Sequence, residues 1–265
     1  MNSRDRRIAA KGAGAQQAVL VWAVFMLVAI LINGTIPFAL GADLHGWTTS
    51  ATKGILFALA IYGGMFLVVP LVLVKGWKTV RQPGFLLPLS IAVLSLTFWE
   101  LLRGIGVVAI ASIAFIHWRY DLSDLGIRWS GTRDNMIAVL LFGAVAATPA
   151  LLQATHASFD ATSGLRAGLD RLLANPASSV EYLFYFGFLA ERLSGKTGRW
   201  ATPLLIGAMY MAHEMTNPEY WYQAIKFYLV FIGVAFAAAL YLWRRSILPV
   251  WLGDGLGRFL SGAIR

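Results

Sequence analysis

Residues 18–40 read AVLVWAVFMLVAILINGTIPFAL, an apolar run without a charged side chain. A helix that crosses the hydrocarbon core of a bilayer needs about 20 mostly apolar residues, and this run is long enough. It is also longer than the apolar region of a signal peptide, so we expect it to remain in the protein as a first helix. The stretch predicts a protein whose fold is built inside a lipid bilayer.

Similar apolar segments continue to the end of the chain. They predict an all-α fold, a polytopic transmembrane bundle of about eight helices. The expected helices lie near residues 17–40, 54–74, 84–117, 135–153, 177–193, 200–216, 222–243 and 246–262. Residues 154–176 are mixed and weakly amphipathic, which favours a helix in the membrane interface around Leu165 to Leu173.

The segment near 84–117 is too long for one crossing perpendicular to the membrane. It contains Glu100, Arg103, Gly104 and Gly106, where a helix can break or a tight hairpin can form. On a continuous helix, Glu100 and Arg103 would share a face and neutralise each other. The sequence therefore leaves open whether this segment crosses once or twice.

Composition supports the membrane interpretation and limits the chemistry. Hydrophobic residues make up 58% of the chain and charged residues only 13%, too few to cover the surface of a water-soluble domain. The formal net charge is +9, but the basic residues flank apolar segments, which indicates membrane orientation and not nucleic-acid binding. The absence of cysteine excludes disulfides, thiolate zinc sites and cysteine nucleophiles. We expect membrane lipids as partners and no nucleic acid.

The basic residues gather in clusters that are candidates for the cytoplasmic side of the membrane. The clusters are Arg4/Arg6/Arg7/Lys11, Lys75/Lys78/Arg81, Arg119/Arg128/Arg133, Arg192/Lys196/Arg199 and Arg244/Arg245. All of them share one side only if the segment near 84–117 crosses twice. The N-terminus is then predicted to be cytoplasmic.

Ionisable side chains inside apolar segments are costly, so they mark functional positions by default. They are Glu100 with Arg103, Glu181, His213 with Glu214, and Asp254 with Arg258. Local interpretations exist for some of them. Ser178 and Glu181 fit the S-x-x-E capping box of a helix start. Asp254 and Arg258 are spaced to form an ion pair along one helix.

The alternative interpretation is that the late polar residues converge. Glu181, His213 and Asp254 lie on separate predicted helices and can meet only in the bundle interior, where Glu181 could act as a general base. The string from His213 to Asn217 is not the zinc motif H-E-x-x-H, because Asn217 stands where the second histidine would be. The sequence leaves open a divalent metal such as zinc, held by one His and two carboxylates, or no cofactor.

These features resemble the CPBP family of intramembrane endopeptidases, which includes CAAX-processing proteases and bacteriocin-linked relatives. Asp124-Leu125-Gly126-Ile127 is similar to the D-L-G-[IL] segment of the family, and Glu181 opens a helix similar to E-E-x-x-x-R followed by G-F-L. Met209 to His213 resembles the family's F-x-x-x-H motif. Asp254 and Arg258 stand in the place of its H-x-x-x-[ND] motif.

The chain departs from the family pattern at several motif positions. Tyr182 replaces the second Glu, Phe186 replaces the motif Arg, and Asp254 replaces the second His. Only Glu181 and His213 carry over unchanged. Since catalytic residues that act as a unit are strongly non-additive, these substitutions put catalysis in doubt.

No repeat or low-complexity tract divides the chain, so we expect a single membrane domain over 1–265. The resemblance implies a CPBP-like core over 121–265, preceded by N-terminal helices over 1–120. It implies a bacterial cell membrane and assigns the catalytic roles to Glu181, His213 and Asp254. The cavity around them is expected to be lined by Tyr182, Phe186, Glu214, Asn217 and Arg258.

Two functions follow from this resemblance. One is peptide hydrolysis within the membrane by a modified glutamate and histidine site. The other is a catalytically inactive relative that uses the same cavity to bind a membrane peptide, protein or lipid. A small transporter is a third class, but the sequence shows no inverted repeat to support it.

Overall fold

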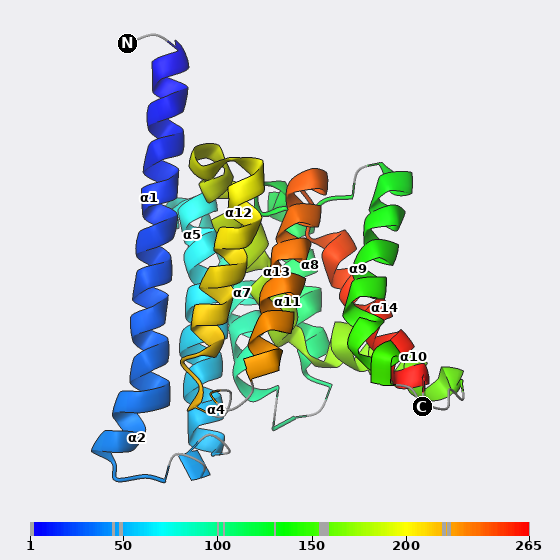
Figure 1. Ribbon diagram of the computed structural model, residues 1–265. Helices are drawn as coiled ribbons and strands as arrows, with labels where there is room; N and C mark the ends of the chain where they lie inside the picture. Colours follow the sequence, from blue (N-terminus) through cyan, green and yellow to red (C-terminus); the bar gives the residue numbers. More distant parts are fainter. Residues whose placement is uncertain are drawn as a thin grey trace.

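The computed structural model describes residues 3–43, 46–47, 50–99, 101–102, 104–129, 131–153, 159–218, 221 and 224–264. These parts of the chain are helices joined by loops, with one isolated β-bridge between Phe159 and Ile264. The predicted all-α class is confirmed. Most helices stand side by side, and α1 (Ser3–Ile30) projects beyond the others at its N-terminal end (Figure 1).

Three helical stretches among the described residues are long and apolar enough to cross a membrane. They are Gly14–Ala39, Ala51–Lys75 and Thr132–Leu151. The elements that form them are α1, η1 (Leu31–Thr35) and α2 (Ile36–Ala39), then α4 (Ala51–Phe57), η2 (Ala58–Val68) and α5 (Val69–Lys75), and finally α9 (Thr132–Gln153). Shorter apolar helices accompany them at Pro83–Phe98, Gly106–Tyr120 and Tyr228–Arg244.

The segment predicted near 84–117 consists of two helices. After the short α6 (Trp77–Val80), α7 (Pro83–Phe98) packs against α8 (Gly106–Tyr120), and Gly104 between them has a φ of +87°, which glycine adopts without strain. Glu100 and Arg103, the predicted pair, lie outside the described residues. Because the chain reverses here, the residues that precede α7 and those that follow α8 lie at the same end of the bundle.

The second half of the chain forms a continuous set of helices around a buried centre. In order they are η3 (Ser123–Leu125), α9, α10 (Ala161–Leu169), η4 (Asp170–Ala174), α11 (Pro176–Tyr182), η5 (Leu183–Ala190), α12 (Glu191–Glu214), α13 (Ala224–Arg244) and α14 (Leu248–Ala263). A kink at Gly198, with a φ of +80°, divides α12 between the two helices predicted near 177–193 and 200–216. The predicted interfacial helix around Leu165 to Leu173 falls on α10 and η4, near the C-terminus in Figure 1.

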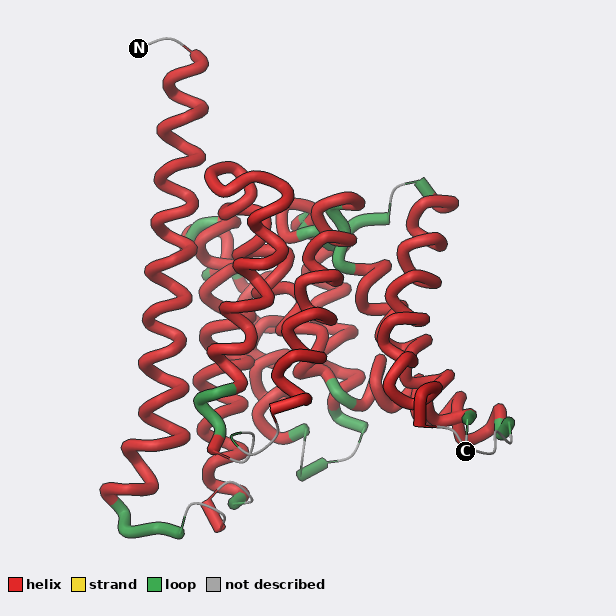
Figure 2. Tube along the Cα trace, in the orientation of Figure 1, coloured by secondary structure: helices red, strands yellow, loops and turns green. Residues whose placement is uncertain are grey.

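The centre of the bundle is η5, in which every residue is buried. A loop from the end of the bundle packs directly on it, because a Cβ on Gly187 would lie 2.1 Å from the carbonyl oxygen of Leu125. Only glycine allows this approach. In Figure 2 the loops lie mostly towards the two ends of the helices.

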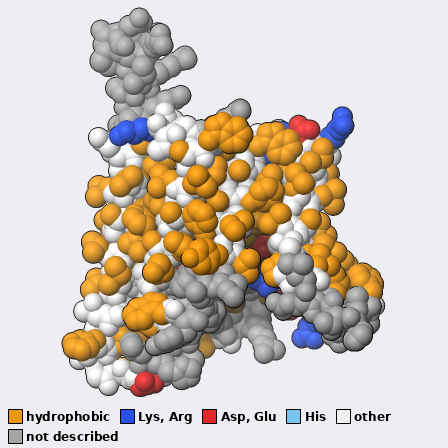
Figure 3. Space-filling view, viewed as in Figure 1, with side chains coloured by type: hydrophobic (Ala, Val, Ile, Leu, Met, Phe, Trp, Pro, Cys, Tyr) orange, Lys and Arg blue, Asp and Glu red, His pale blue; other side chains and the backbone are white. Residues whose placement is uncertain are grey.

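Basic residues from three of the predicted clusters, Lys75, Arg128 and Arg245, lie at one end. Lys75 contacts Asp124 at 3.2 Å, the Arg128 Nε donates to the carbonyl of Arg245 at 2.6 Å, and Arg245 contacts Glu191 at 2.7 Å. The face of the molecule shown in Figure 3 is largely apolar, with charged side chains mostly towards its upper and lower margins. Four parts of the chain that are far apart in sequence thus share one charged end.

Candidate functional site

A cavity of about 600 Å³ lies in the second half of the bundle, with α9 and α13 as its apolar walls. Its titratable and hydroxyl-bearing lining residues are Thr148, Arg171, Glu181, Tyr182, Tyr185, Tyr210, Glu214 and Arg258. Figure 3 shows an acidic side chain deep between apolar groups in the middle of this face. The cavity therefore combines apolar walls with a charged interior, which is an uncommon combination in the middle of an apolar bundle.

Glu181 faces this cavity from α11. Its Oε2 accepts a hydrogen bond of 3.2 Å from the hydroxyl of Tyr210 on α12. The capping-box interpretation is wrong: α11 begins at Pro176 with Asn175 as its cap, and the Ser178 hydroxyl donates to the carbonyl of Asn175. Glu181 is therefore held by another helix and not by its own helix start.

Asp254 on α14 is buried and tightly bonded. Its Oδ2 accepts hydrogen bonds from the Tyr182 hydroxyl at 2.8 Å and from the Nε of Arg171 on η4. The predicted ion pair with Arg258 is not formed, because the carboxylate is turned to Arg171 on another helix. Removing two charges from water is costly, and the additional Tyr182 hydrogen bond offsets part of that cost.

Arg258 and Glu214 complete the charged lining. Arg258, an exposed residue, is part of the cavity lining and forms no ion pair with any residue that the structure describes. Glu214 is four residues after Tyr210 on α12, which places the two on one face of that helix. The charged lining thus consists of Glu181, Glu214, Arg258 and Arg171, and Asp254, the partner of Arg171, is not itself a lining residue.

His213 lies outside the cavity lining. It is 6% exposed and its ring packs among aromatic rings from the first half of the chain, with the Phe25 centroid at 4.8 Å and that of Phe57 at 6.1 Å. Its Nδ1 has no hydrogen-bond partner among the described residues. Tyr210 lies between the two predicted catalytic residues, because it donates to Glu181 and its ring centroid is 5.7 Å from that of His213.

The predicted trio is therefore only partly brought together. Glu181 lines the cavity, Asp254 is linked to it through Tyr182, and His213 is separated by Tyr210. No three His, Asp or Glu side chains in the described part of the chain are close enough to hold a metal ion. The donor set that a zinc ion would need is thus not assembled by these residues.

The remaining predicted residues differ in position. Tyr182 and Phe186 line the cavity, and their stacked rings have centroids 5.4 Å apart. Asn217 is not among the lining residues.

Two residues of the site, Arg171 and Tyr210, were not predicted from the sequence. Arg171 lies in the weakly amphipathic stretch before Pro176, and only its charge next to an apolar segment could have drawn attention to it.

No family model, curated protein or solved structure matches the chain. The resemblance to CPBP endopeptidases stays a prediction.

Proposed function

We propose that the chain is a multi-pass integral membrane protein whose cavity between α9 and α13 binds a membrane-embedded amphiphile, either a lipid or a hydrophobic peptide. The long apolar helices and the apolar outer surface support the membrane placement. The shared basic end supports a cytoplasmic N-terminus by the positive-inside rule. Reversal of the chain between α7 and α8 is what makes that shared end possible.

The observation that carries the proposal is the distribution of polarity within the cavity. Leu229 and Ile232 on α13 are more than half exposed on the outside of the bundle, and the same helix face continues into the cavity. Glu181, Glu214 and Arg258 line the same cavity. An amphiphile can place its chain between the apolar walls and its polar group against the charged interior.

Gly233 allows this proposal to be tested without damaging the core. It lines the cavity, and a Cβ placed on it would meet no atom within 4 Å. Gly233→Leu should therefore add volume to the cavity lining, with open space at its Cβ. Gly34 is a matched control, because its Cβ position is equally open and it does not line the cavity.

The experiment uses two photoactivatable probes in vesicles, a diazirine-bearing phosphatidylethanolamine and a diazirine-bearing polyleucine peptide. We expect at least one probe to crosslink to residues 142–149 or 229–237. Gly233→Leu should reduce that crosslinking several-fold, and Gly34→Leu should leave it unchanged. Crosslinking only outside residues 142–149 and 229–237, or equal crosslinking in both variants, would contradict binding in this cavity.

Peptide hydrolysis is a second candidate, favoured by the position of the Glu181 carboxylate. Hydrolysis needs a base for water, a group to stabilise the oxyanion and a proton donor for the leaving amine. Glu181 would take a proton from water and return it to the leaving amine. Tyr210, which donates to Glu181, and Arg258, which lines the same cavity, are the candidate hydrogen-bond donors to the oxyanion. His213 would act only as a positioning residue, through its contact with the Tyr210 ring.

Hydrolysis and binding can be separated by one substitution. If the protein is a hydrolase, Glu181→Gln abolishes cleavage of a membrane peptide by the purified protein and leaves probe crosslinking intact. Glu191→Gln, a change of the same kind outside this cavity, should cleave like the wild type. Unchanged cleavage in Glu181→Gln, or no cleavage by the wild type, would exclude hydrolysis at this site and leave the binding proposal standing.

A further inference from the structure

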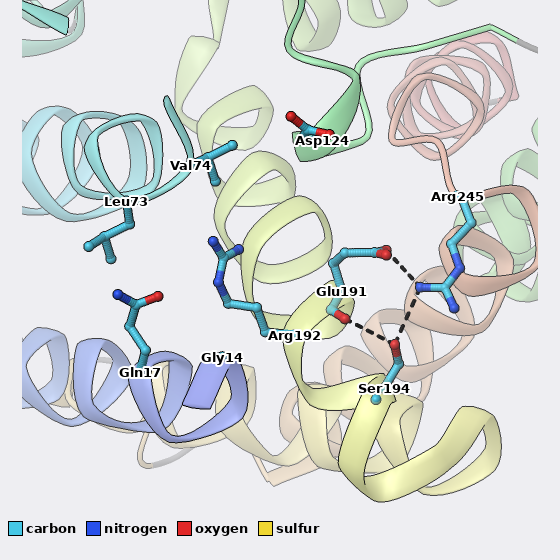
Figure 4. Close-up of a pocket in the computed structure, with 10 residues that line it drawn as sticks. Gly14, Gln17, Leu73, Val74, Asp124, Glu191, Arg192, Ser194 and Arg245 are labelled. Atoms are coloured by element: carbon cyan, nitrogen blue, oxygen red, sulfur yellow. Dashed lines mark hydrogen bonds and ion pairs between the residues drawn. The ribbon is translucent and has the colours of Figure 1, made fainter. Parts of the chain in front are cut away.

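A second hollow, of about 810 Å³, lies at the basic end of the bundle (Figure 4). It is bordered by α1, the end of α5, the loop at Asp124 and the beginning of α12. None of its lining residues lines the cavity between α9 and α13. Whatever it binds is therefore independent of the candidate site described above.

The acidic side chains of this hollow are already bonded to basic ones. The Glu191 Oε2 accepts from Arg245 at 2.7 Å and from the Tyr241 hydroxyl at 3.0 Å. The Asp124 Oδ2 accepts from Lys75 at 3.2 Å. With both carboxylates engaged in this way, a further cation in the hollow is in excess over the acids.

Arg192 is that further cation. It forms no hydrogen bond or ion pair with the residues that the structure describes, and its guanidinium lies over the Phe188 ring at 4.0 Å from the centroid. Figure 4 shows its side chain pointing away from Glu191 and Arg245, towards Gln17, Leu73 and Val74. Stacking on Phe188 holds the planar group in place and leaves its N–H edges available.

We infer that this hollow binds the phosphate group of an anionic membrane lipid, with Arg192 as the principal donor. A guanidinium presents two parallel N–H groups that match two phosphate oxygens. The side-chain amide of Gln17 lies on the same side of the hollow and can add a further donor. The surrounding basic end attracts anionic headgroups over a longer range.

The position of the hollow favours a lipid over a free phosphate. Leu73 and Val74 line it on the side of α5, and the outward face of α1 continues below it with the exposed apolar residues Leu20 and Leu27. A lipid could place its headgroup on Arg192 and its acyl chains along these residues. This step rests on the proposed membrane placement, although not on the proposed amphiphile cavity.

The test uses the full-length protein purified in a neutral detergent. Dioleoyl phosphatidylglycerol, dioleoyl phosphatidylcholine and inorganic phosphate are added separately, and bound lipid is counted by native mass spectrometry alongside the melting temperature. We expect phosphatidylglycerol to bind and stabilise the wild type more strongly than phosphatidylcholine. Arg192→Gln should lose that preference, and Arg192→Lys, which keeps the charge without the planar fork, should retain part of it.

Lys78→Gln is the matched control, because it removes the same charge from an exposed side chain at the same end. It should bind phosphatidylglycerol like the wild type. Equal preference for phosphatidylglycerol in Arg192→Gln and Lys78→Gln would overturn the inference. If inorganic phosphate alone raises the melting temperature with the same dependence on Arg192, the ligand is a free phosphate and the lipid assignment is wrong.

Discussion

The same set of groups occurs twice in this protein, once in the middle of the bundle and once at its basic end. In the middle, one oxygen of Asp254 accepts hydrogen bonds from Arg171 and from the hydroxyl of Tyr182. At the end, one oxygen of Glu191 accepts from Arg245 and from the hydroxyl of Tyr241. Each set joins an arginine, a carboxylate and a tyrosine.

The two sets differ mainly in their exposure to solvent. The side chains of Arg171 and Asp254 are 24% and 10% exposed, whereas those of Arg245 and Glu191 are 38% and 39% exposed. A charge left without its partner can be hydrated at the end of the bundle, but the buried charge cannot. The same three kinds of side chain should therefore contribute more to the free energy of unfolding in the middle of the bundle than at its basic end.

The largest effect is expected from Asp254→Asn. Removing one partner of a buried ion pair typically costs about 3–5 kcal/mol, because the other charge stays buried without compensation. Glu191→Gln, at the exposed set, should cost about 0–1 kcal/mol. The measurement is the free energy of unfolding of both variants in mixed micelles.

A second substitution sharpens that result. If the cost of Asp254→Asn comes from the uncompensated Arg171, adding Arg171→Gln should recover part of the lost stability. Equal costs for Asp254→Asn and Glu191→Gln would show that water reaches both sets, and the contrast between them would fail.

An intermediate effect is expected from the tyrosine of the buried set. Tyr182→Phe deletes a hydrogen bond to a charged group, which is typically worth about 1.5–3 kcal/mol. Tyr241→Phe makes the same deletion at the basic end, where Glu191 is more exposed and can be hydrated instead, so the cost should be smaller. The free energies of unfolding of the two phenylalanine variants provide the measurement. In the Asp254→Asn background Tyr182→Phe should cost less, because the hydroxyl then donates to a neutral amide oxygen. An undiminished cost there would mean that the charge of Asp254 does not strengthen this hydrogen bond.

Several features of the fold could be predicted from sequence because they depend on local composition. The apolar runs predict helices, and the glycines at 104 and 106 indicate that the segment near 84–117 can turn. The number of helices in that segment could not be decided, since one long tilted helix and a hairpin have similar composition. The packing of α7 against α8 decides it.

The site was harder to predict because its contacts are distant in sequence. Arg171 and Asp254 are separated by 83 residues, whereas Arg258 is only one helical turn from Asp254, so the local pair was the natural but wrong prediction. His213 was expected near Glu181 on the basis of motifs in the second half of the chain. Its neighbours Phe25 and Phe57 come from the first half, which those motifs do not cover.

The smallest expected effect on stability is at Asp121, an exposed carboxylate. It follows the buried Asp254 and the partly exposed Glu191 in order of exposure. Asp121, between α8 and η3, accepts hydrogen bonds of 3.0 Å from the backbone N–H and the hydroxyl of Ser123, and these two bonds hold its pKa below the ordinary value of 3.8. A carboxyl group whose pKa is lower in the folded state stabilises the protein above its ordinary pKa. This stability is lost as the pH falls through the pKa of the folded state.

Ser123→Ala, which keeps the backbone bond to Asp121, should therefore be slightly less stable than wild type at neutral pH. That difference should vanish in acid, and Ser123→Thr, which keeps a hydroxyl, should behave like the wild type. Melting temperatures measured from neutral pH down to acid check this, and a difference that persists at low pH would assign the effect to packing and not to the Asp121 charge.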